Sequence, residues 1–174
     1  MTLEKYRYIV VEGPIGVGKT SLAQRLADHL GADILLEKPQ ENPFLERFYE
    51  DPQRHAMSTQ LFFLFQRINE VRDQAQMDLF NTRTVSDYLF DKDTLFARLN
   101  LSDDEFKLYQ NIYQSLAPQA PAPDLVIYLQ ASTDTLIERV RRRGHNYERL
   151  LKDDYLTRLS DSYGDFFQIG RAHV

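Results

Sequence analysis

"GPIGVGKT", residues 13–20, is the stretch that decides the fold of this chain. It follows the pattern Gly-x-x-x-x-Gly-Lys-Ser/Thr, in which glycines let the loop curl around an anion with its backbone N–H groups turned inward. In such a loop Lys19 reaches the outer phosphates of a nucleotide, and the Thr20 hydroxyl binds Mg²⁺. A buried-strand composition precedes the loop and a helical repeat of leucines follows it. We therefore expect a phosphate-binding loop that holds a nucleoside triphosphate between a strand and a helix.

The bulk composition narrows the class of protein. The chain has 174 residues, of which 43% are hydrophobic, and this is enough to bury the core of one globular domain. Its net charge of −5 argues against a general nucleic-acid binder, which needs a basic face. It has no cysteine, so disulfides, thiolate metal sites and cysteine nucleophiles are excluded. No apolar run suits a membrane span and the N-terminus does not resemble a signal peptide, so we expect a cytoplasmic protein without a membrane partner.

Strand-like and helix-like segments alternate along the chain. The strand-like segments are residues 6–13, 32–37, 82–87 and 124–130. The helix-like segments are residues 21–31, 42–52, 53–77, 92–99, 102–116, 132–144 and 153–167. Ser102 with Glu105 forms a capping pattern, and Ser132 caps the helix that it precedes. This alternation predicts an α/β fold with a parallel sheet.

Two acids end predicted strands. Glu37 closes the second strand and Asp87 closes the third. The carboxyl ends of parallel strands share the edge at which open α/β folds bind ligands, so both acids are expected beside the phosphates. Glu37 suits a base for a hydroxyl acceptor, whereas Asp87 and Thr20 offer the hard oxygens that Mg²⁺ prefers. The alternative is that each acid is a helix cap or a solvated strand end.

Polar residues in two other segments suggest further contacts. Four arginines, at 139, 141, 142 and 143, end one helix and indicate a lid over the transferring phosphate; the alternative is a basic last turn that offsets the helix dipole. Gln60 and Arg67 lie seven residues apart on one face of an apolar helix. Buried, they would need partners, and the Gln60 amide matches the donor and acceptor of a base edge. The alternative is a stripe that faces solvent.

Several of these motifs together resemble the deoxynucleoside kinase family, in the family's order. They are "GPIGVGKT", "LLEKP", "NPFLERFYEDPQRHAMSTQ", "PDLVIYL" and "RVRRRGHNYE". The resemblance implies a P-loop NTP hydrolase-like three-layer sandwich and transfer of the γ-phosphoryl group of ATP, with Mg²⁺, to the 5′-hydroxyl of a deoxynucleoside. It also implies a homodimer. The resemblance thus names the 5′-hydroxyl of a deoxynucleoside as the group that receives the phosphoryl group.

The resemblance also implies roles for single residues. Glu37 takes the 5′-hydroxyl proton, and Arg139 and Arg143 bind the transferring phosphate. The implied donor site comprises Gly13, Ile15, Gly16, Val17, Gly18, Lys19, Thr20 and Arg141. The implied deoxynucleoside site comprises Glu37, Tyr49, Gln60, Arg67, Asp87, Phe96 and Glu148, with Tyr49 and Glu148 on the sugar and Gln60 on the base. Thr20 and Asp87 are the implied metal residues.

The chain departs from the family pattern at two places. After the third strand the family usually has an acid-arginine-serine triplet, whereas this chain has Asp87, Tyr88 and Leu89. The arginine that would steady the glutamate and the 5′-oxygen is therefore missing. In the lid, Gly144 and His145 stand where a second arginine is common, so a titrating group replaces a fixed charge. Asp91 and Asp93 are the candidates to partner Arg67.

The end of the chain does not follow the family pattern. We interpret residues 1–167 as a deoxynucleoside kinase domain that is incomplete at its C-terminus, and residues 168–174 as a non-native tail. The sequence from Ile169 to Val174 matches the translation of a sequencing adapter; the alternative is a natural disordered terminus. Without the family's fifth strand, residues 124–130 would form an exposed edge. We expect such a chain to be prone to aggregation and to bind ATP weakly.

Two other functions compete with deoxynucleoside phosphorylation. A nucleoside monophosphate kinase of the thymidylate kinase type shares the phosphate loop and the arginine lid, but it needs a grip on the acceptor's phosphate. A catalytically silent nucleotide-binding subunit of a heterodimer is the alternative from another class. Turnover by the isolated chain distinguishes this last alternative from an enzyme. The preferred base stays open, because the Gln60 amide can flip to suit several base edges.

Overall fold

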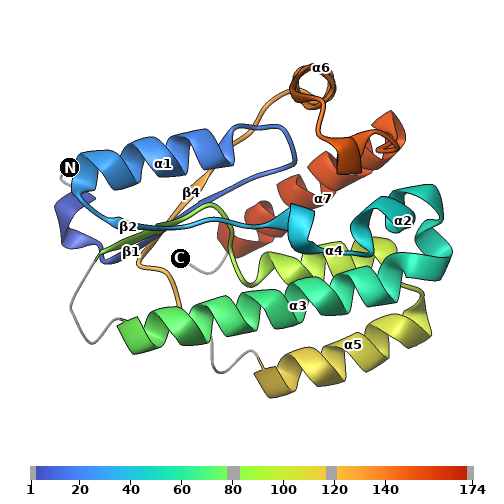
Figure 1. Cartoon of the computed structure of the whole chain (residues 1–174), viewed down its shortest axis with the longest axis horizontal. Coiled ribbons are helices and arrows are strands. Elements are labelled where there is room, and N and C mark those ends of the chain that lie inside the picture. Colours follow the sequence, from blue (N-terminus) through green and yellow to red (C-terminus); the bar gives the residue numbers. More distant parts are fainter. Residues whose placement is uncertain (1–2, 78–82, 117–120, 172–174) are drawn as a thin grey trace.

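A computed structural model of the chain describes residues 3–77, 83–116 and 121–171. Its centre is a parallel sheet of four strands in the order β2-β3-β1-β4 (Figure 1). The strands are β1 (Tyr8–Glu12), β2 (Asp33–Leu35), β3 (Thr84–Ser86) and β4 (Leu125–Tyr128). Ile9 of β1 pairs with Val85 of β3 on one side and with Leu125 of β4 on the other. The loop after β1 therefore leaves from the middle of the sheet.

The helices cover both faces of this sheet (Figure 1). They are α1 (Lys19–Leu30), α2 (Leu45–Glu50), α3 (Pro52–Met77), α4 (Lys92–Asn100), α5 (Asp103–Leu116), α6 (Thr133–Arg143) and α7 (Asp153–Arg171). Short 3₁₀ turns occur at η1 (Leu3–Lys5), η2 (Pro39–Glu41) and η5 (Asn146–Glu148). None of the described helices is long and apolar enough to cross a membrane.

Apolar packing explains the layers. On one face, Ala23 and Ala27 of α1 pack against Ile9 and Val11, and these four side chains are almost fully buried. On the other side, α4 and α7 pack through a cluster that includes Leu95, Leu159 and Tyr163 and reaches Tyr128 of β4. A further cluster joins α3, α4 and α5. The sheet is thus enclosed between helix layers, and the predicted α/β sandwich with a parallel four-stranded sheet is confirmed.

The predicted elements are present, with shifted ends. The strand predicted over 32–37 is only three residues long. The chain leaves the sheet after Leu35, so Glu37 lies in the segment that follows the strand. Both predicted caps form: the Ser132 hydroxyl accepts the Thr135 N–H, and Glu105 accepts the Ser102 N–H. In the described part of the chain β4 pairs with β1 alone.

The last helix crosses the predicted domain boundary. α7 was expected over 153–167 but continues to Arg171, so it includes part of the segment interpreted as a tail. Residues 172–174 of that segment lie outside the described residues. The division into 1–167 and 168–174 stays a prediction.

Candidate active site

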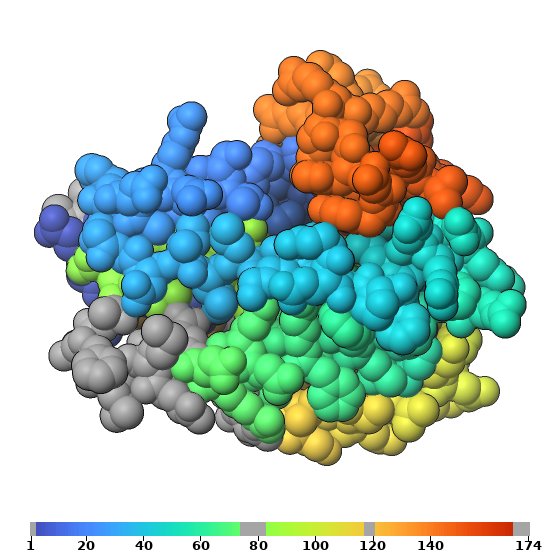
Figure 2. Space-filling model, viewed as in Figure 1, coloured from blue at the N-terminus to red at the C-terminus, as the bar shows by residue number. Residues whose placement is uncertain are grey.

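A cavity of about 280 Å³ opens at the carboxyl edge of the sheet. Its walls come from the phosphate loop, the segments that follow β2 and β3, one side of α3, and the segment after α6. In Figure 2 the orange lobe formed by α6 and the residues after it lies against the cyan segment around residues 38–45. Residues of both segments line the cavity, including Pro39, Gln40, Arg143 and Tyr147. One cavity therefore joins the phosphate loop to the wall formed by α3.

The phosphate loop has the backbone that its glycines predict. Gly16 has a φ of 87°, a left-handed conformation that strongly favours glycine. A Cβ atom on Gly13 would lie 2.5 Å from the Leu129 carbonyl oxygen, so the loop passes too close to the end of β4 for any side chain. The Lys19 ammonium donates to the carbonyl oxygens of Gly13 (2.7 Å) and Pro14 (3.2 Å). This places the lysine across the loop, where the outer phosphates of a nucleotide bind.

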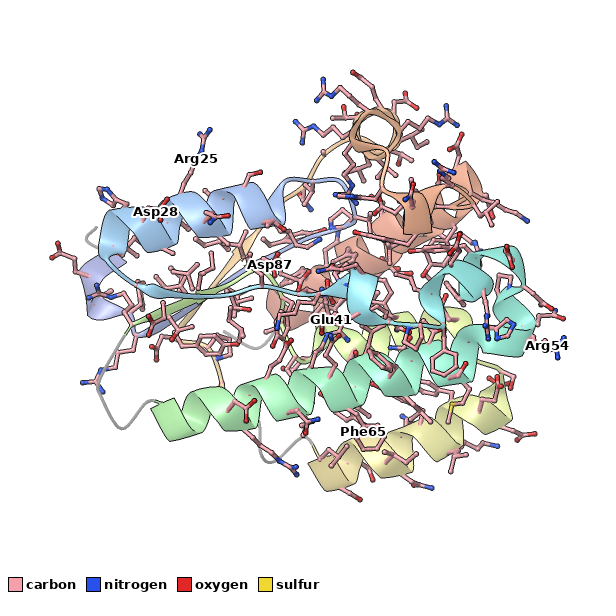
Figure 3. All side chains as sticks on the ribbon, viewed as in Figure 1. Arg25, Asp28, Glu41, Arg54, Phe65 and Asp87 are labelled. Atoms are coloured by element: carbon pink, nitrogen blue, oxygen red, sulfur yellow. The ribbon has the colours of Figure 1, made fainter. Side chains whose placement is uncertain are left out.

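Asp87 connects the phosphate loop to Glu37, the predicted proton acceptor. One of its carboxylate oxygens accepts the Thr20 hydroxyl at 2.6 Å, and the other accepts the Glu37 N–H at 2.7 Å. Figure 3 shows Asp87 in the interior of the molecule, whereas Arg25 and Asp28 of α1 point outward. Burial raises the pKa of Asp87, while the bonds to Thr20 and Glu37 oppose this rise. The Thr20 hydroxyl and the Asp87 carboxylate are adjacent hard oxygens, so the residues present fit Mg²⁺.

Glu37 lies between two cations. The Arg67 guanidinium pairs with one carboxylate oxygen, and the Lys92 ammonium lies 3.2 Å from the other. Burial by itself would raise the pKa of Glu37, but Lys92 first and Arg67 second hold the pKa far below its usual range. Glu37 is therefore a carboxylate at neutral pH and able to accept a proton or a hydrogen bond.

The wall formed by α3 carries the polar residues that are predicted to lie at the nucleobase of the substrate. Arg67, only 4% exposed, pairs with Asp93 as well as with Glu37, and its guanidinium lies over the Phe63 ring. Of the two candidate partners, Asp93 makes the ion pair, whereas Asp91 accepts a hydrogen bond from a tyrosine of α5. The Gln60 amide is buried and donates to the Asp93 carbonyl oxygen at 3.2 Å. This amide and the ion pair thus form one polar patch in an apolar wall.

The predicted sugar contacts, Tyr49 and Glu148, also line the cavity. Tyr49 lines the cavity among other aromatic rings, with the Tyr155 ring 6.2 Å away, and burial raises its pKa well above the usual range. Glu148, 8% exposed, accepts two hydrogen bonds from the Arg143 guanidinium. Arg143 was expected on phosphate, so in this structure the two predicted ligands bind each other. His145 stacks on Tyr147.

Not all predicted residues reach the cavity. Twelve line it: Ile15, Gly16, Lys19, Thr20, Glu37, Tyr49, Gln60, Arg67, Asp87, Phe96, Arg143 and Glu148. Gly13, Val17, Gly18, Arg139 and Arg141 are not among its lining residues. Arg139 donates to the Val17 carbonyl oxygen at 3.1 Å, which keeps it on the back of the phosphate loop. Arg141 pairs with Asp153 at the start of α7. Their roles toward phosphate remain predictions.

Sequence reasoning missed two buried charges of this site. Glu12, fully buried, ends β1 directly before the phosphate loop. An acidic residue at the end of a buried strand could have been recognised in the sequence as a charge in need of a partner. Lys92, 2% exposed, begins α4 and lies 3.5 Å from Glu12. The hint at Lys92 was the missing arginine after Asp87, because Glu37, the predicted proton acceptor, would then need another cation.

The fold and the site define a class of protein. A phosphate loop at the centre of a parallel sheet, with a carboxylate beside it in the same cavity, is the arrangement of a nucleotide-dependent phosphotransferase. The family model described as deoxynucleoside kinase matches residues 9–171. The chain therefore belongs to the deoxynucleoside kinase family.

Individual relatives agree with this assignment. A deoxyguanosine kinase from Bacillus subtilis (strain 168) is 34% identical over 157 residues, which cover 90% of this chain and 76% of the relative. A deoxyadenosine kinase from Lactobacillus acidophilus (strain ATCC 700396 / NCK56 / N2 / NCFM) is 32% identical over 174 residues, which cover 92% of this chain and 79% of the relative. The family assignment favours a kinase of nucleosides over the nucleoside monophosphate kinase alternative.

Solved structures share the fold. A deoxyadenosine kinase from M. mycoides with the products dCMP and a flexible dCDP bound has a TM-score of 0.85 at 24% identity, covering 95% of this chain and 86% of that one. The same kinase with bound dATP has a TM-score of 0.78 at 25% identity, covering 92% and 84%. The fold predicted for this chain is thus that of known kinases, and as a member of this family the chain uses a nucleotide phosphate donor.

Proposed function

We propose that this chain transfers the γ-phosphoryl group of ATP to the 5′-hydroxyl of a deoxynucleoside in nucleotide salvage. One observation carries the proposal. One cavity is lined by residues of the phosphate loop, by the Glu37 carboxylate, and by the Tyr49, Gln60 and Glu148 side chains. A donor held on the loop and a nucleoside held by these side chains would bring their reacting atoms together at Glu37.

The donor end supplies charge to the phosphates. Lys19 leaves the loop carbonyl oxygens on which it rests and binds the outer phosphates, while loop N–H groups hold the rest. Thr20 and Asp87 would hold Mg²⁺, which would offset the negative charge of the phosphates. Arg143 pairs with Glu148 in the structure, and we propose that it binds the transferring phosphate when the site fills.

The acceptor end supplies the proton acceptor. The 5′-oxygen attacks the γ-phosphorus, its proton passes to a Glu37 oxygen, and the bond from that phosphorus to the β,γ-bridging oxygen breaks to release ADP. Glu37, as a carboxylate, would first orient the hydroxyl by accepting its hydrogen bond and then accept its proton.

We infer that the base is a purine. Relatives at 32–34% identity are named deoxyguanosine and deoxyadenosine kinases. The Gln60 amide and the Arg67–Asp93 pair offer donors and acceptors on one wall, which suits the hydrogen-bonding edge of a base, and the named relatives favour a purine there.

A substrate panel tests the proposal. The purified chain is assayed with ATP and Mg²⁺ against the four common deoxynucleosides and against dAMP, dGMP and dTMP, and ADP release is measured. We expect turnover with the purine deoxynucleosides above all. Turnover with a monophosphate in their place would support the nucleoside monophosphate kinase alternative, and ATP binding without any turnover would support the silent subunit.

Two further features belong to the proposal. We expect two copies to associate, and two large exposed apolar side chains on adjacent helices, Phe65 of α3 and Leu108 of α5, suit such a contact. Light scattering on a size-exclusion column measures this. A cytoplasmic location and the absence of a nucleic-acid partner stay predictions from the sequence.

A further inference from the structure

The residue after Asp87 does not provide charge to the site. Tyr88 is fully buried, and its hydroxyl donates to Glu70 of α3 at 3.0 Å. Its ring lies 5.8 Å from the guanidinium carbon of Arg67. Position 88 therefore packs against α3 and leaves one oxygen of Glu37 to another cation.

Lys92 supplies that cation from the first residue of α4. Its ammonium lies 3.2 Å from one oxygen of Glu37 and 3.5 Å from one oxygen of Glu12, and its side chain is 2% exposed. Lys92 also lines the cavity. A buried ammonium group needs polar or charged partners, and these two acids supply them, so they determine its place.

Glu12 does not depend on Lys92 alone. Its carboxylate accepts hydrogen bonds from the Gly13 N–H at 2.9 Å, the Tyr163 hydroxyl at 2.9 Å and the Leu89 N–H at 2.6 Å. Three donors already satisfy Glu12, and the ammonium of Lys92 lies closer to Glu37. Glu12 therefore holds Lys92 in place, while Lys92 acts on Glu37.

The two cations around Glu37 have different second partners. Arg67 binds one oxygen of Glu37 and also Asp93, which ties it to the α3 wall. Lys92 binds the other oxygen and also Glu12, which ties it to the phosphate loop. With a separate cation on each oxygen, the Glu37 carboxylate has one orientation, and that orientation is set from both the α3 wall and the phosphate loop.

From this geometry we propose that Lys92 is a positioning residue for the phosphoryl transfer. From the start of α4 it holds one oxygen of Glu37 and orients the carboxylate toward the acceptor hydroxyl. The expected effect of Lys92 on turnover rests on the proposed function, whereas its contact with Glu37 does not.

The kinetic test replaces Lys92 by methionine, which keeps the length and removes the charge. Lys107→Met, on the outer helix α5, is the matched control. For K92M we expect kcat to fall by about 10²-fold, with the KM values for ATP and for the deoxynucleoside nearly unchanged. The reason is that the lost contact acts on Glu37, the proton acceptor, and not on a bound substrate. Lys92→Arg keeps a cation and is expected to regain part of the loss. A kcat for K92M equal to that of K107M overturns the proposal.

The second readout does not need turnover. Lys92 contacts one carboxylate oxygen of Glu37, so its removal changes the surroundings of that carboxyl group. Carbon-13 NMR of labelled glutamate carboxyl groups at one neutral pH, with the Glu37 signal assigned through Glu37→Gln, should show this signal displaced in K92M and not in K107M. An undisplaced signal in K92M overturns the proposal. If the signal is displaced but the wild-type chain shows no turnover, the contact stands and the proposed function fails.

Folding is the remaining control. If K92M does not fold, the double variant Glu12→Gln with Lys92→Met removes the acid and the cation together. We expect this variant to melt cooperatively and still to show the reduced kcat. If instead it regains wild-type kcat, Lys92 only neutralises Glu12, and its proposed action on Glu37 is wrong.

Discussion

The phosphate loop and the segment from Asp87 to Asp93 form two sides of one cavity, but they use their residues in different ways. In the loop, function depends on the backbone: N–H groups must point inward, and the glycines leave no room for other residues at 13 and 16. In the segment after β3, function depends on charge: Lys92 and Asp93 reach Glu37 and Arg67 from the start of a helix. Backbone geometry requires a fixed residue at a fixed position, whereas a charge can come from any element that ends nearby. The two sides therefore tolerate different changes.

The largest effect is expected at the point where the two sides meet. Glu37→Gln keeps the shape of the side chain and removes its ability to take a proton. We expect kcat to fall by about 10²- to 10⁴-fold, while ATP binding, measured by calorimetry, stays close to wild type. A variant that keeps most of its turnover would exclude Glu37 as the base.

Gly13→Ala tests the dependence of the loop on its backbone. The new methyl group would lie 2.5 Å from the Leu129 carbonyl oxygen, so either the loop or the end of β4 must move. We expect a loss of about 1–3 kcal/mol in stability, with weaker ATP binding. Thermal melting and calorimetry measure the two effects. Gly164→Ala, in α7 with open space around its Cα, is the control and is expected to be neutral or stabilising.

Tyr49→Phe tests the part of the cavity where the sugar is expected. Only one oxygen is lost, so the fold should be kept. We expect kcat/KM for the deoxynucleoside to fall by an amount equivalent to about 1–2 kcal/mol, mainly through KM, because one hydrogen bond to the substrate is missing. If the kinetics do not change, Tyr49 is a packing residue only.

The smallest kinetic effect is expected at Tyr88. Its hydroxyl bonds to Glu70 and not to a residue of the cavity, so Tyr88→Phe should leave kcat unchanged. The lost hydrogen bond should reduce stability by about 1 kcal/mol, which lowers the melting temperature of a domain of this size by about 2–4 °C. A large fall in kcat with normal melting would mean that position 88 acts in the reaction, and the difference between the two sides of the cavity would then be smaller than argued above.

Local pattern was sufficient where chemistry requires a particular backbone or period. The phosphate loop, the helical repeat after it and the alternation of strands and helices are short-range features, so the sequence alone predicted the parallel sheet and the place of Lys19, Thr20 and Glu37. The predicted ends were less accurate. α7 continues to Arg171, because nothing between Phe167 and Arg171 interrupts a helix except one glycine, which a helix tolerates at a modest cost.

Partners far apart in the sequence were decided by the tertiary structure. That Lys92 lies against both Glu12 and Glu37 follows from three separate elements meeting at one sheet edge, and no spacing along the chain encodes it. The same holds for Arg143, which in this structure binds Glu148 and not the phosphate loop, and for Arg141, which faces Asp153. The sequence by itself determined the fold class and the phosphate loop, because these depend on local geometry and on glycine. The tertiary structure alone decided which cations hold Glu37, because electrostatic contacts depend on distance in space and not on order in the chain.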